Sequence, residues 1–269
     1  MSRTRASLCS MALLGLLVLA SLTEQVVLVA AAVVVVQGLI AAAPSPPDER
    51  GRAQGGPRFW PALLAGLVAV VLTTWPGLLV GSEGLRAGRE GLVSNGIIAG
   101  IVPAVAVAVL VSLVAQMLRR DGRPRLVITT GHAVTLGVFA ALAASWISAS
   151  RAAAGAEVVI VGAVGVAAAL LVWSLPLDRI VCASLSLAAG GAAAAGATVV
   201  FDGITTVLFG VVVGMAAAIF AVLGQVLGRA WSQGRTHASQ GWGFPGALAV
   251  ALPAPIIHVC GQLVGLPFL

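Results

Sequence analysis

Long apolar runs, separated by short polar or glycine- and proline-rich breaks, fill most of the chain. A membrane-spanning helix needs about 17 to 25 consecutive apolar residues. Nine runs are roughly that long: 8–23, 26–43, 59–80, 92–118, 126–148, 158–177, 180–200, 204–228 and 246–266. Runs such as 26–36 and 158–172 lack the apolar–polar alternation of transmembrane β-strands. The pattern predicts an all-α, polytopic transmembrane helix bundle of about nine helices, forming a single integral membrane domain over residues 1–269.

The arginines between these runs predict the orientation, because basic residues in short loops are held on the cytoplasmic side. A cytoplasmic N-terminus makes the breaks at 44–58 and 229–243 cytoplasmic loops. Three arginines then lie outside: Arg86, Arg89 and Arg151. The other twelve lie inside: Arg3, Arg5, Arg50, Arg52, Arg58, Arg119, Arg120, Arg123, Arg125, Arg179, Arg229 and Arg235.

Glu24 lies in the apolar stretch 8–43, either as a buried carboxylate or at a turn. One crossing in this stretch would put the basic segments around Arg5 and Arg58 on opposite sides, whereas two crossings keep both inside. A charge at a helix centre costs about 2.5–3.5 kcal/mol on insertion scales. We therefore expect Glu24 in an outer turn. Alternatively, residues 1–20 form a signal peptide cut after Ala20, which leaves eight helices.

Composition excludes several functions. The chain is 59% hydrophobic and 9% charged, with a mean hydropathy of +1.07, whereas soluble domains are about 25% charged. It has no lysine, so lysine-based P-loop, Schiff-base and general-base chemistry is excluded. The sequence pI is about 11.2, but no loop is long enough for a nucleic-acid-binding domain. The three cysteines lack metal-ligand spacing, and we expect no cofactor and no metal.

Small residues line one face of the run 204–228. At about 100° per residue, the face contains Gly210, Gly214, Ala217, Ala221, Gly224 and Gly228, which we call the small-residue stripe. Such stripes let helix backbones approach closely in lipid. The run 180–200 is also small in its second half and returns through three residues, which favours a tight hairpin within one subunit. A homodimer seam is the alternative. Gln225 borders the stripe and could form a hydrogen bond across it.

Polar groups near or within the runs give further candidates. The arginines Arg119, Arg120, Arg123 and Arg125 predict a loop among anionic lipid headgroups, or a phosphate site for a lipid or nucleotide. His132 and His258 lie within runs, and Gln262 follows His258 on the same helix face. Each histidine is either a functional group, in a proton relay or metal pair, or a neutral side chain hydrogen-bonded in the bundle.

Two glutamines and five prolines also lie within or near the apolar runs. Gln37 and Gln116 lie near predicted helix ends and receive no role. Prolines interrupt several runs and either kink helices or free carbonyl groups for ligands. They are Pro76, Pro103, Pro176, Pro253 and Pro255.

The basic loop before a helix, the TTWPG stretch at 73–77 and the small-residue helices resemble the layout of bacterial phosphatidate cytidylyltransferases over residues 26–228. The resemblance implies a multi-pass enzyme that makes CDP-diacylglycerol with metal-bound aspartates near its C-terminal end. That family's signature needs a lysine, a Gly-Asp pair and a His-Gly-Gly run followed by Asp-Arg. The matching region here, 220–246, contains no acidic residue. No catalytic residue is carried over, and a chain related to this family would have lost its metal site and activity.

Two functions follow from these patterns. The first is a non-enzymatic protein of the bacterial plasma membrane, either a permease-like carrier or a partner subunit of an envelope complex. The alternative is a membrane enzyme that handles lipid phosphates, with the arginines of 119–125 binding phosphate and His132 or Asp178 in acid–base roles. The expected partners are membrane lipids, including anionic headgroups, and a membrane protein or a second copy of the chain. Nucleic acid is not expected.

Overall fold

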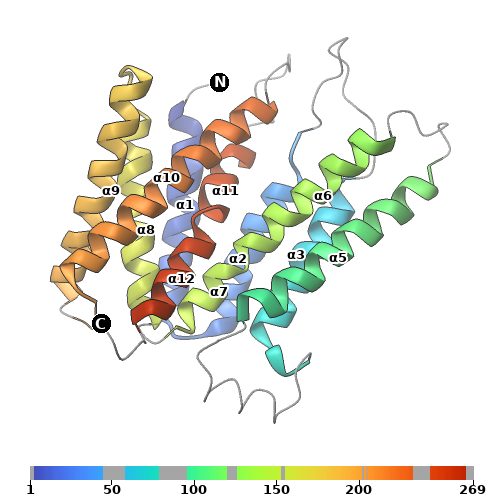
Figure 1. The fold of residues 1–269 in the computed structure, drawn as a ribbon, viewed down its shortest axis with the longest axis horizontal. Helices are drawn as coiled ribbons and strands as arrows, with labels where there is room; N and C mark the ends of the chain where they lie inside the picture. The colour runs from blue at the N-terminus through green and yellow to red at the C-terminus, as the bar shows by residue number, and fades with distance from the viewer. Residues whose placement is uncertain are drawn as a thin grey trace.

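The computed structural model describes residues 3–44, 58–78, 96–119, 126–152, 155–201, 203, 205–232 and 243–264. These residues are almost entirely helical and contain no strand (Figure 1). The helices are α1 (Arg3–Leu22), α2 (Val26–Ala41), α3 (Phe59–Thr74), the short 3-10 helix η1 (Pro76–Leu78), α5 (Gly96–Met117), α6 (Leu126–Ala143), α7 (Ser145–Ser150), α8 (Gly155–Trp173), α9 (Arg179–Phe201), α10 (Val207–Ser232), α11 (Gly243–Ala251) and α12 (Ala254–Val264).

The predicted all-α bundle is confirmed: each of the nine apolar runs contains at least one α-helix among its described residues. Within the described ranges, seven helical segments are long and apolar enough to cross a membrane. The apolar helices α2 and α3 are shorter, with 16 residues each. At 1.5 Å per residue they span about 24 Å, against a hydrocarbon core of about 30 Å. The chain is therefore a multi-pass α-helical membrane protein.

The helices form two groups with a set of helices between them. Helices α8, α9 and α10 pack on one another, as do α2, α3, α5 and α6. Helices α1, α7, α11 and α12 lie between the groups and contact both (Figure 1). The short helix α7 contacts α12 and α8 as well as α2 and α3. The interface between the groups is thus built partly from the shortest α-helices of the described bundle.

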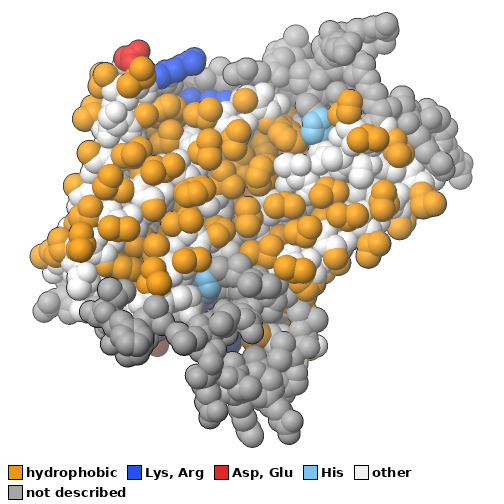
Figure 2. Space-filling view, in the orientation of Figure 1, with side chains coloured by type: hydrophobic (Ala, Val, Ile, Leu, Met, Phe, Trp, Pro, Cys, Tyr) orange, Lys and Arg blue, Asp and Glu red, His pale blue; other side chains and the backbone are white. Residues whose placement is uncertain are grey.

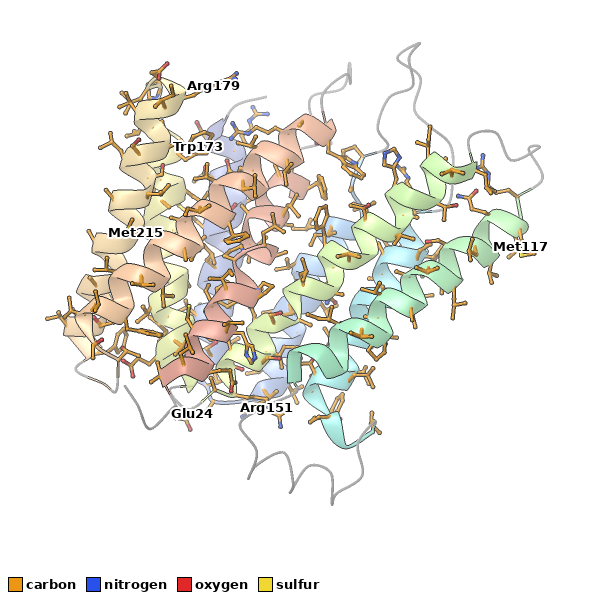
Figure 3. The ribbon with its side chains drawn as sticks, viewed as in Figure 1. Glu24, Met117, Arg151, Trp173, Arg179 and Met215 are labelled. Atoms are coloured by element: carbon orange, nitrogen blue, oxygen red, sulfur yellow. The ribbon has the colours of Figure 1, made fainter. Side chains whose placement is uncertain are left out.

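Charged side chains lie at the two ends of the bundle. Figure 3 places Arg179 at the end where the chain begins, and Arg151 and Glu24 at the opposite end. Successive spans alternate in direction, so Arg58, Arg119 and Arg229 also flank the end of the bundle with Arg179, which we call the basic end. Hydrophobic side chains cover the face between the ends (Figure 2). Side chains such as Val127 and Val200 are more than 80% exposed, as expected of surfaces that face lipid.

The first two helices are joined by a tight turn at Glu24, as the arginine pattern predicts. Helix α1 ends at Leu22 and α2 begins at Val26. Glu24 has φ +58°, in the left-handed region that non-glycine residues seldom adopt. Glu24 is therefore a turn residue and not a buried carboxylate.

Helix α1 is an integral part of the core. Leu13, Leu14 and Leu17 are buried, and the helix contacts α2, α8 and α11. The Ser10 hydroxyl donates a hydrogen bond to the Gly246 carbonyl oxygen of α11, at 3.0 Å. The eight-helix alternative would remove these contacts from the bundle.

The small-residue stripe of α10 is occupied within one chain. A side chain added at Gly210 or Gly214 would meet α9, against Ala194 in both cases. One added at Gly224 would come within 2.7 Å of the Leu248 carbonyl oxygen, and one at Gly228 within 2.5 Å of Pro245, both on α11. Ala217 and Ala221, between these positions, are fully buried. The stripe packs α10 on α9, as the hairpin hypothesis requires, and also on α11. It leaves no surface for a dimer seam at these positions.

Candidate functional site at two interrupted helices

Two of the membrane-spanning segments are interrupted. The first interruption lies at Ala144, between α6 and α7. The Ala144 N–H donates to the Ala141 carbonyl oxygen at 3.0 Å, three residues back, and not to Ala140 as an unbroken α-helix would require. The side chain of Gln37 on α2 takes over that acceptor. Its Nε2 donates to the Ala140 carbonyl oxygen at 2.9 Å and to the Gly66 carbonyl oxygen on α3 at 3.1 Å.

The second interruption lies at Leu252 and Pro253, between α11 and α12. Pro253 and Pro255 have no N–H, so the carbonyls of Ala249 and Ala251 lack the donors that a continuous helix would supply. The Val250 carbonyl oxygen, between them, accepts a hydrogen bond of 2.9 Å from the indole Nε1 of Trp146. Trp146 is fully buried on α7. Trp146, which follows the interruption at Ala144, therefore donates a hydrogen bond at the interruption between α11 and α12.

Helix α7 is the structural centre of this region. Of its six residues, all but Ser150 are buried. Arg151 follows the helix, and its Nη1 donates to the carbonyl oxygens of Thr73 and Thr74, each at 3.0 Å. These carbonyls lie at the C-terminal end of α3, where the helix dipole favours a positive charge. Arg151 thus ties α7 to α3 at the end opposite to the basic end (Figure 3).

Four buried polar atoms around α7 have no hydrogen-bond partner within the protein. They are the hydroxyl oxygens of Ser145, Ser148 and Thr74, and Nδ1 of His258. Ser145 and Ser148 are on α7, Thr74 ends α3, and His258 is on α12, which packs on α7. Buried polar groups are nearly always hydrogen-bonded, so a concentration of exceptions marks a candidate site. We call these four side chains the α7 cluster.

The two predicted histidines belong to different parts of the bundle. His258 is buried in the α7 cluster, and Gln262 lies one turn further along α12, half-buried. His132 lies near the start of α6, about 18 Å along the helix axis from the first interruption. Its ring packs edge-on against Trp231 of α10, with the centroids 4.9 Å apart. The two histidines therefore lie in different parts of the described bundle and do not pair with each other.

Trp231 joins several segments at the basic end. Its indole Nε1 donates to the Pro44 carbonyl oxygen at 3.1 Å, and its ring lies 6.1 Å from that of Phe244. The start of the 44–58 segment is thus held against the end of α10 and the start of α11. Because the His132 ring packs on Trp231, His132 lies at the basic end and away from the α7 cluster.

Two arginines at the basic end, Arg229 and Arg119, each donate a hydrogen bond to a buried glutamine that in turn donates to a hydroxyl group on a neighbouring helix. Arg229 donates to Gln225 Oε1 at 2.7 Å, and Gln225 Nε2 donates to Ser7 Oγ of α1 at 3.1 Å. Arg119 donates to Gln116 Oε1 at 2.9 Å, and Gln116 Nε2 donates to Thr129 Oγ1 of α6 at 3.0 Å. Both glutamines are buried. Gln225 bonds to a neighbouring helix as predicted, although to α1.

Arg119 is the one predicted phosphate-binding arginine in the described ranges. Arg120, Arg123 and Arg125 lie outside the described residues. Gln116 connects Arg119 to α6, so this arginine has a definite place at the end of α5.

Glu157 anchors the segment that precedes α10, a role that no sequence pattern indicated. It lies in the first turn of α8, and its Oε1 accepts hydrogen bonds from the backbone N–H of Thr205, at 3.1 Å, and from the Thr205 hydroxyl. A carboxylate here caps the chain just before α10 begins. Glu157 therefore fixes the α9–α10 hairpin to α8.

Sequence reasoning missed the residues that connect the two interruptions. Gln37 lies near the end of its helix, yet it donates to two other helices. Trp146 and the serines of α7 lie in a run whose local pattern shows no break. Pro253 and Pro255 were the available signal, since prolines can free helix carbonyls.

No protein-family model, curated protein or solved structure matches the chain. Within the described ranges, no three His, Cys, Asp or Glu side chains are grouped so that they could hold a metal ion. The fold and the site define a multi-pass membrane protein with two interrupted helices that meet at a buried polar cluster. Its function has to be inferred from that arrangement.

Proposed function

We propose that this protein is a permease-like carrier of the bacterial cytoplasmic membrane, with the basic end on the cytoplasmic side. The excess of arginine at that end supports the orientation. The observation that carries the function is the meeting of two interrupted helices, linked by the hydrogen bond from Trp146 to Val250. Discontinuous helices in the membrane interior are a recurring feature of the substrate sites of secondary transporters.

The arrangement of the helices supports the same proposal. The two helix groups meet through α7 and α12, which hold most of the α7 cluster. Carriers move one group of helices against another around a fixed site. Short helices with freed carbonyls offer fewer backbone constraints to such a movement than continuous helices. A partner subunit with only a structural role would not need them.

Access to position 145 tests the proposal. In a variant with Cys9, Cys182 and Cys260 replaced by alanine, Ser145→Cys should react with a membrane-impermeant cationic methanethiosulfonate. We expect reaction in right-side-out vesicles and, separately, in inverted vesicles. Ser145 is only 1% exposed in this structure, so labelling from either side requires the bundle to open there.

Ala217→Cys in the same background is the matched control. Ala217 is also fully buried, but it lies in the small-residue stripe. It should stay unlabelled from both sides. Labelling of position 145 from one side only, or from neither, would contradict a carrier and favour a structural subunit.

A further inference from the structure

We propose that the α7 cluster is the binding site of this carrier and that its ligand is a small, uncharged, hydrogen-bonding solute. The inference rests on the proposed function and adds the chemical class of the substrate. Four side chains carry it: Thr74, Ser145, Ser148 and His258. Their exposed fractions are 8%, 1%, 5% and 2%, and each has a polar atom without a partner in the protein.

The four side chains lie around a single turn of the chain. Ser145 and Ser148 are three residues apart on α7, and at about 100° per residue they point about 60° apart. Arg151 lies three residues beyond Ser148, and its hydrogen bond to the Thr74 carbonyl oxygen brings the end of α3 to this turn. His258 lies on α12, which packs on α7. The unpartnered polar atoms therefore lie on α7 and on two helices that contact it, α3 and α12.

The interruption of α6 keeps these groups unpaired. In a continuous helix, a serine hydroxyl commonly bonds to the carbonyl three or four residues earlier, as Ser10 does with Ala6 and Ser186 with Cys182. For Ser145 and Ser148 those carbonyls are at residues 141–145, where the helix is broken and the Ala141 carbonyl already accepts from Ala144. Their hydroxyl groups remain available to a ligand.

The charge of the surroundings selects the ligand class. The described residues of α7 and α3 carry no charge, and Arg151, which follows α7, is balanced by the carbonyls at the C-terminal end of α3. Glu157, at the start of α8, binds Thr205. An ion placed in the cluster would lose its hydration without a counter-charge, which is strongly unfavourable. Hydroxyl groups both donate and accept hydrogen bonds, as a neutral polar solute requires.

Solute flux into proteoliposomes tests the inference. Stopped-flow light scattering would follow glycerol and urea as neutral probes, with sodium formate and choline chloride as charged probes. We expect glycerol or urea to enter faster than into protein-free vesicles, while formate and choline do not. Ser148→Ala and His258→Phe should each lower this flux about five-fold, the effect of losing roughly 1 kcal/mol of one hydrogen bond.

Thermal stability separates binding from a structural role. Ser148→Ala removes a polar atom that has no partner, so the midpoint of thermal unfolding should stay the same or rise. The control is Ser186→Ala on α9, which is equally buried but removes a hydroxyl that donates to Cys182 at 2.7 Å. It should lower the unfolding midpoint and leave the flux unchanged.

The outcomes separate this inference from the proposed function. Equal flux in Ser148→Ala and the control, a lower unfolding midpoint for Ser148→Ala, or flux of formate or choline alone would each overturn the inference. If position 145 can be labelled from both sides while neither neutral probe enters, the ligand class is wrong and the carrier stands. If position 145 cannot be labelled from both sides, the carrier itself fails.

Discussion

At the scale of single residues, Glu24 lies in the turn that reverses the chain between α1 and α2, and its backbone conformation there is unfavourable. Its φ of +58° is left-handed, which costs a non-glycine residue about 1–2 kcal/mol. The turn also uses the Thr23 hydroxyl, which donates to the Ala20 carbonyl oxygen at 2.7 Å and accepts from the Gln25 N–H at 3.3 Å. The side chain of Thr23 therefore holds the backbone of the turn in place.

We expect Glu24→Gly to stabilise the protein by about 0.5 kcal/mol, because glycine adopts this conformation freely but loses more entropy on folding. The measurement is the midpoint of thermal unfolding in mild detergent. The neighbouring change Thr23→Gly should lower that midpoint, since it removes two hydrogen bonds and relieves no strain. A lower midpoint for Glu24→Gly would mean that the carboxylate has a role of its own.

At the scale of helices, α10 shows how closely two backbones can pack when side chains are absent. Gly214 lies against Gly190 and Ala194 of α9, whereas Val212, about 160° round the helix, is 55% exposed. Close packing provides dispersion contacts that the hydrophobic effect does not replace in lipid. One face of α10 is therefore sensitive to side-chain size, and the other is not.

Gly214→Leu should lower the free energy of unfolding of the bundle by about 1–3 kcal/mol, the usual cost of overpacking. Val212→Leu should be nearly silent. Because the stripe packs within the chain, size-exclusion chromatography should show the same oligomer size for both variants, and only thermal stability should differ. Equal tolerance at the two positions, or a change from dimer to monomer with Gly214→Leu, would contradict this account of the stripe.

Across the whole molecule, the apolar runs predict the all-α bundle, and arginine placement predicts the turn at Glu24. Both signals are local. The interruption at Pro253 is also local, because proline lacks an N–H. The interruption at Ala144 is not, since the segment LAASWIS contains neither proline nor glycine. It depends on Gln37, more than a hundred residues earlier, which caps the freed carbonyl. The α7 cluster could not be predicted from the sequence, because it depends on this contact between residues that are far apart along the chain.

The orientation of the whole molecule can be tested by labelling single cysteines in a cysteine-free background. Gly88→Cys and Ala154→Cys should react with a membrane-impermeant thiol reagent in intact cells, because the positive-inside rule puts them outside. Gln54→Cys, Gly122→Cys and Gln233→Cys should react only after the membrane is opened. Reaction at position 122 in intact cells would reverse the orientation.

The bonds of α1 also set the order of assembly. Ser7 and Ser10 reach their partners Gln225 and Gly246 only across 218 and 236 residues of sequence. At about 5–20 residues per second, a ribosome needs roughly 10–50 s to make that stretch. During this interval the Ser7 hydroxyl lacks its partner Gln225, and the Ser10 hydroxyl bonds only within its own helix, to the Ala6 carbonyl oxygen. The bundle can close only when the last span arrives, so a chain that stops before α11 lacks the contacts between α1 and α11, including the hydrogen bond from Ser10 to Gly246.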